Sequence, residues 1–128
     1  MPCRPPRLFD HVTLRVRDIA RSRAFYERAL QPFGVRVVES SQGPLGFATD
    51  DRGDFWIKEQ GTAAGPVHIA FAAPNRETVD AFHAAAVEAG GVDNGGPGLR
   101  PHYHSAYYAA FVLDPDGNNL EAVFRGDQ

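Results

Sequence analysis

The chain contains an internal duplication, and this feature restricts its fold more than any other. Shifted by 57 positions, His11 aligns with His68 and Gly34-Val35 with Gly91-Val92; further along, at an offset of 64, Phe47 aligns with Phe111 and Gly53 with Gly117. Because the offset rises from 57 to 64, the second copy carries seven extra residues between Gly91 and Phe111. A chain of 128 residues with two such copies is expected to fold as two similar modules.

Each copy predicts the same element order, a βαβββ module. In the first copy, apolar and polar residues alternate over 11–16, Asp18 is a candidate N-cap, and helical spacing runs over 19–30. The remaining predicted strands of the first copy are 35–39, 45–49 and 55–59. The second copy predicts a strand over 68–72, a helix over 76–89, and strands near Val92, over 107–113 and over 120–124. Tight turns are expected at Asp51-Arg52-Gly53 and at Asp114-Pro115-Asp116-Gly117.

The sequence therefore predicts one α+β domain over residues 1–128, with module one at about 8–60 and module two at about 66–125. The segment from Gly61 to Pro66 joins them and is too short to separate two independent domains.

Three residues are candidate metal ligands. His11 and His68 occupy equivalent positions at the start of the first strand of each module, and Glu121 places a charge inside an apolar strand, where an unpaired carboxylate is costly. Two imidazoles and one carboxylate can bind Fe, Mn, Zn or Ni and leave positions open. Taken singly, each histidine is more often a hydrogen-bonded structural residue and a glutamate is usually solvated. The duplication favours the metal site.

The first module offers no matching carboxylate. At an offset of 64, the counterpart of Glu121 is Ile57, which cannot ligate a metal. Glu59 lies two residues further on the same strand face and is a candidate fourth ligand, or else a solvated strand end.

Three segments resemble the vicinal oxygen chelate superfamily, which includes glyoxalase I, extradiol dioxygenases, fosfomycin resistance enzymes and bleomycin-binding proteins. These segments are Asp10-His11-Val12-Thr13-Leu14, Val67-His68-Ile69-Ala70-Phe71 and the run from Asp114 to Glu121. The resemblance implies paired modules forming an open, barrel-like mixed sheet around a divalent metal that chelates two neighbouring substrate oxygens. It also implies a homodimer, in some members with the metal site shared between chains.

The reaction is left open by this resemblance. Glyoxalase I uses a carboxylate from each module, a pattern from which Ile57 departs, whereas extradiol dioxygenases and fosfomycin enzymes use the His, His, Glu set matched here. Thr13 matches a threonine of the fosfomycin enzymes and is a candidate substrate-binding residue, although threonine is common in strands.

The inserted segment of module two is a candidate for substrate recognition and proton transfer. His102 and His104 are candidate acid–base residues acting with Glu121, while Arg100, Tyr103 and Tyr107 are candidate substrate contacts. Trp56 is a further candidate contact, with core packing as the alternative reading. The alternative for the whole segment is an ordinary polar surface loop.

Composition narrows the class of partner. The net charge is −3 without a basic run, Cys3 is the single cysteine, and neither a signal peptide nor a membrane span is evident. We therefore expect a cytoplasmic protein with a small-molecule substrate, binding neither nucleic acid nor membrane. Two functions stay open: a metal-dependent lyase, isomerase or dioxygenase, and a non-catalytic protein that binds a drug or metabolite.

Overall fold

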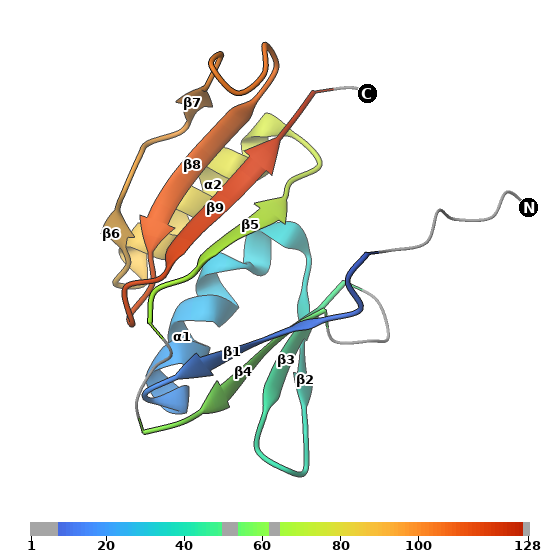
Figure 1. Cartoon of the computed structure of the whole chain (residues 1–128), viewed down its shortest axis with the longest axis vertical. Helices are drawn as coiled ribbons and strands as arrows, with labels where there is room; N and C mark the ends of the chain where they lie inside the picture. The colour runs from blue at the N-terminus through green and yellow to red at the C-terminus, as the bar shows by residue number, and fades with distance from the viewer. Residues whose placement is uncertain (1–7, 50–53, 62–64, 127–128) are drawn as a thin grey trace, which may run out of the picture.

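The computed structural model describes residues 8–49, 54–61 and 65–126, and shows two βαβββ modules (Figure 1). Module one comprises β1 (Val12–Val16), α1 (Ile19–Ala29), a 3-10 turn η1 (Gln31–Phe33), β2 (Arg36–Glu39), β3 (Leu45–Ala48) and β4 (Phe55–Glu59). Module two comprises β5 (His68–Ala72), α2 (Arg76–Glu88), β6 (Val92–Asp93), β7 (Gly98–Leu99), β8 (Tyr108–Leu113) and β9 (Asn119–Phe124). The predicted α+β class and the paired modules are confirmed. The turn predicted at Asp51-Arg52-Gly53 and part of the linker lie outside the described residues.

The strands form two separate sheets with equivalent topology. Sheet A has the order β1-β4-β3-β2 and sheet B the order β5-β9-β8-β6, with β7 paired to β8. In each sheet the first strand of the module runs parallel to the last, and the other neighbours are antiparallel. Strands β1 and β5 are the end strands of their sheets, so the sheets are not joined into a barrel within one chain.

Both helices begin with the same capping interaction. The side chain of Asp18 accepts a hydrogen bond from the backbone N–H of Arg21 at 3.1 Å, and Asn75 accepts from Thr78 N at 2.8 Å. A short polar side chain here satisfies an N–H group that has no partner within the helix. The duplication therefore reproduces the local chemistry that starts each helix.

The two modules share one hydrophobic core on the helical side of the sheets. Phe25 and Tyr26 of α1 and Phe82 of α2 are at most 1% exposed and belong to the same cluster as Leu14 of β1 and Leu120 of β9. In Figure 1, α2 lies behind sheet B. Because strand side chains alternate, the residues between these core positions lie on the opposite face, which we call the open face of each sheet.

Asp114 fixes the turn between β8 and β9. It is 5% exposed, and its carboxylate accepts hydrogen bonds from Asp116 N and Asn118 N, from the Asn118 amide, and from the Tyr26 hydroxyl at 2.5 Å. Burial and the neighbouring Asp114 raise the pKa of Tyr26 well above its ordinary value, so its hydroxyl stays protonated and donates. This bond ties α1 of module one to the turn of module two.

Replacing Tyr26 with phenylalanine should lower the free energy of unfolding by about 1–3 kcal/mol, because Asp114 then lacks one buried donor. Urea titration followed by circular dichroism measures the loss. Tyr108→Phe is the matched control: it removes a hydroxyl that donates to Asp80 at an exposed position, and should change stability by less than about 0.5 kcal/mol. Equal losses in the two variants would contradict this account.

Candidate functional site

A histidine–glutamate pair lies on the open face of sheet B. Glu121 on β9 is 2% exposed, and its Oε1 lies 2.8 Å from Nε2 of His68, the first residue of β5. Ala70 is the register partner of Glu121, and His68 shares the face of Ala70 because it lies two residues earlier. The sheet itself therefore brings together two of the three predicted metal ligands.

Tyr107 occupies the other oxygen of the Glu121 carboxylate. Its hydroxyl donates a short hydrogen bond to Oε2. Burial, and then the hydrogen bond to Glu121, raise the pKa of Tyr107 to about 12. The hydroxyl therefore keeps its proton near neutral pH, and each oxygen of this buried carboxylate has its own polar partner.

A series of ring contacts leads from Tyr107 to the surface. The Arg125 guanidinium carbon lies 4.9 Å from the centre of the Tyr107 ring, and the Tyr103 ring lies 5.1 Å from it. The His102 ring follows at 4.1 Å from Tyr103, which is 61% exposed. Tyr107 thus contacts Glu121, Tyr103 contacts Tyr107, and His102 contacts Tyr103.

His104 and Arg100 shape this loop. Nδ1 of His104 accepts from the backbone N–H of Ala106 at 3.0 Å, and Arg100 donates to the carbonyl oxygens of Gly96 and Gly98, each at 2.8 Å. The Arg100 backbone N–H also donates to Tyr107 O at 2.7 Å. Arg100, predicted as a substrate contact, holds its own loop closed through these carbonyls.

His11 lies apart from the pair within one chain. It is an exposed residue of module one whose Nδ1 lies 2.8 Å from Asp10 Oδ1. Figure 1 shows β1 and β5 running in opposite directions, with their starting ends on opposite sides of the molecule. Over residues 8–49, 54–61 and 65–126, no three His, Cys, Asp or Glu side chains gather closely enough to hold a metal ion.

The strand registers correct the predicted correspondence between modules. Thr13 pairs with Trp56, and its counterpart Ala70 pairs with Glu121. The position equivalent to Glu121 is therefore Trp56 rather than Ile57, because the two copies differ by one more residue than the sequence alignment assumed. Ile57 is fully buried in the core on the helical side.

Glu59 also lies towards the helices. Its Oε1 accepts a hydrogen bond from the backbone N–H of Ile19 at 2.9 Å, at the first turn of α1. A carboxylate at this place satisfies a free N–H and interacts favourably with the helix dipole. The structure thus gives Glu59 a role in starting α1, on the side of sheet A away from Thr13 and Trp56.

Thr13 and Trp56 both lie on the open face of sheet A, as their pairing requires. Trp56 covers Gly46 of β3: a Cβ atom built on Gly46 would lie 3.0 Å from the indole ring. The indole therefore rests against the open face through a close approach that a side chain at Gly46 would crowd, and it lies outside the hydrophobic core clusters of the described residues.

The His68–Glu121 pair fits two positions of a metal ion. Two ligand atoms bound to one ion at about 2.1 Å and at right angles lie about 3 Å apart, close to the 2.8 Å between Nε2 and Oε1. Imidazole nitrogen and carboxylate oxygen are donors that suit Fe, Mn, Zn and Ni. The two atoms and their spacing therefore fit adjacent positions around a divalent cation, as well as the direct contact that they make with each other.

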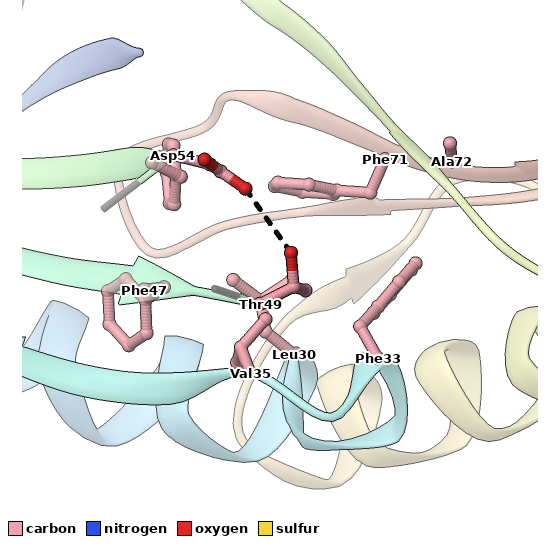
Figure 2. A pocket seen from close by; sticks show the side chains of 9 residues that line it. Leu30, Phe33, Val35, Phe47, Thr49, Asp54, Phe71 and Ala72 are labelled. Atoms are coloured by element: carbon pink, nitrogen blue, oxygen red, sulfur yellow. Dashed lines mark hydrogen bonds between the residues drawn. The ribbon is translucent and has the colours of Figure 1, made fainter. Parts of the chain in front are cut away.

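A separate cavity of about 270 Å³ opens between the modules (Figure 2). It is lined mainly by apolar side chains from η1, the ends of β3 and β5, and the start of β4, and its polar side is formed by Thr49, which donates to Asp54 at 3.4 Å. Its nine lining residues include none of the predicted site residues. This cavity is distinct from the His68–Glu121 pair.

Comparison with known proteins identifies the family. Residues 8–122 match the Glyoxalase/Bleomycin resistance protein/Dioxygenase superfamily. The chain belongs to this superfamily. A glyoxalase/bleomycin resistance protein from Albidiferax ferrireducens T118 is 32% identical, with a TM-score of 0.80 over 93% of this chain and 99% of that one. No curated protein matches the chain.

More distant superfamily members share the fold. A glyoxalase/bleomycin resistance protein/dioxygenase family enzyme from Burkholderia phytofirmans PsJN is 23% identical, with a TM-score of 0.69 over 90% of this chain and 96% of that one. Lactoylglutathione lyase from Agrobacterium tumefaciens is 20% identical, with a TM-score of 0.67 over 94% and 96%. Within the described residues no helix has the length and apolar character needed to cross a bilayer.

Sequence reasoning missed the bond between Tyr107 and Glu121 and the position of Arg125. The predicted turn at Asp114–Gly117 could have indicated both, because an antiparallel hairpin around this turn pairs Phe111 with Glu121. Tyr107 lies four residues before Phe111 and Arg125 four after Glu121, so alternation places both on the open face.

Changing Gly46 to valine should displace the indole of Trp56 from the open face, because the added side chain would occupy the space of the ring. Trp56 is the single tryptophan, so its fluorescence reports the change directly. We expect the emission maximum to move to longer wavelength as the ring becomes more exposed. Gly61→Val, at an exposed position with nothing within 4 Å of a built Cβ, is the matched control, and identical spectra for both variants would refute the close approach.

Proposed function

We propose that this superfamily member is a metal-dependent enzyme, of the lyase, isomerase or dioxygenase type, that acts on a small oxygenated substrate chelated by a divalent ion. The observation that supports the proposal most strongly is the buried Glu121 carboxylate beside Nε2 of His68. A carboxylate buried on a sheet face destabilises the fold unless its charge is compensated. A bound cation gives a reason for keeping it there.

The third proposed ligand is His11 of a second copy of the chain. His11 and His68 begin equivalent strands, and β1 and β5 are unpaired at one edge within the described chain. A twofold association would set module one of each copy beside module two of the other and form two equivalent sites. Exposed apolar side chains near these edges, Leu8, Val12 and Val67, favour burial in such a contact.

When bound, the ion would act as a Lewis acid that holds two neighbouring substrate oxygens and stabilises negative charge on them. Around it, Tyr103 would offer an exposed aromatic surface to the substrate. His102 and His104 lie on the same loop and are proposed to act as acid and base toward the substrate. Thr13 and Trp56 would contribute the wall from the open face of module one.

Metal analysis tests the ligand assignment. The purified chain should retain a divalent metal, while His11→Ala, His68→Ala and Glu121→Ala should each lose most of it, because every variant removes one of three ligands. Inductively coupled plasma mass spectrometry measures the metal-to-protein ratio. His83→Ala is the control: His83 bonds Asp93 outside the site, and its metal content should equal that of the unmodified chain. Equal metal in all variants would leave the non-catalytic binding protein as the better assignment.

Mixing variants tests whether the site is shared. If each site takes His11 from one copy and His68 from the other, an equal mixture of His11→Ala and His68→Ala chains, unfolded and refolded together, should recover about one quarter of the full metal content. Half of the dimers would then be mixed, each with one intact site. A mixture of His68→Ala with Glu121→Ala should recover none, since both ligands come from the same module. No recovery in the first mixture would contradict a shared site.

A further inference from the structure

We propose that Tyr107 is a positioning residue for the metal site: its hydroxyl holds one oxygen of Glu121, so that the carboxylate presents only its other oxygen to the ion. This inference rests on the proposed function, because it concerns how Glu121 ligates. In this role Tyr107 holds Glu121 in position and does not itself contact the substrate.

The two oxygens of Glu121 have different surroundings. Oε1 faces Nε2 of His68, the other proposed metal-binding atom of the pair. Oε2 accepts a hydrogen bond from the Tyr107 hydroxyl. A carboxylate that binds an ion through both oxygens would have to give up the second bond. The structure therefore favours ligation through Oε1 alone.

Tyr107 is itself held in place on several sides. Its ring is 8% exposed and packs between the Arg125 guanidinium and the Tyr103 ring. Its backbone carbonyl accepts from Arg100 N, and its N–H donates to His104 O at 3.1 Å. A side chain with these contacts keeps its hydroxyl at one place, as a positioning group requires.

Ligation through one oxygen has a consequence for substrate binding. An ion with octahedral preference that is held by two imidazoles and one carboxylate oxygen keeps about three positions open, against two when both oxygens bind. The additional position leaves room for a co-substrate or water beside two chelating substrate oxygens. Tyr107 would thus set how many positions the site leaves open.

The test compares Tyr107→Phe with Tyr108→Phe in Co(II) titrations of the full chain. Tyr108 is the adjacent residue, and its hydroxyl donates to Asp80 at 2.6 Å, away from Glu121. We expect Tyr107→Phe to bind Co(II) about 10-fold or more weakly and to change the shape and intensity of the visible absorption bands, which report coordination number. Tyr108→Phe should match the unmodified chain in both measurements.

A spectrum and affinity for Tyr107→Phe equal to those of the unmodified chain, with Glu121→Ala losing Co(II), would overturn this inference and leave the proposed function standing. An unmodified chain that takes up no Co(II) would overturn both. If Tyr107→Phe does not fold alone, it is refolded with excess Co(II). Its spectrum then decides the question in the same way. If Tyr107→Phe stays unfolded with Co(II), by circular dichroism, while Tyr108→Phe folds, Tyr107 is a structural residue and the inference is overturned.

Discussion

The carboxylate of Glu121 is the group on which the open face of sheet B depends. It is 2% exposed in a strand whose neighbours are apolar, so it needs a polar partner at each oxygen to remain there. His68 and Tyr107 supply these partners, and the contact with Tyr107 requires the loop over residues 100–107 to fold back towards β8. A hydrophobic residue in this place would make the strand easier to bury. This polar arrangement accords with the proposal that Glu121 holds a metal ion.

The duplication gives the two modules the same frame but leaves their open faces different. On the helical side, both modules place apolar residues in one shared core, and the helix caps Asp18 and Asn75 are equivalent. On the open side, the position that holds Glu121 in module two holds Trp56 in module one. Core packing therefore keeps the helical side of the two modules alike, whereas their open faces carry different side chains.

Much of this arrangement was predictable from local patterns. Alternation and helical spacing located the strands and helices, and the charge of Glu121 within an apolar strand indicated a carboxylate with polar partners. The counterpart of Glu121 was not predictable in the same way, because the register between β1 and β4 depends on pairing across the sheet rather than on nearby residues. Likewise, Glu59 and Arg100 look like free charged groups in the sequence, but backbone groups of α1 and of the inserted loop engage them.

The inserted segment explains why the buried carboxylate lies in module two rather than in module one. In module one, β2 and β3 are joined by a short turn in which Ser40 N donates to Pro44 O at 3.3 Å. In module two, the longer connection carries Tyr107 and packs the Tyr103 ring against it at a tilted angle. A buried carboxylate and the loop that supports it thus occur in the same copy. Without Tyr107, one oxygen of the buried Glu121 carboxylate would lose its hydrogen-bond donor. Without Glu121, the Tyr107 hydroxyl would lose its acceptor. Each residue therefore satisfies the buried polar group of the other.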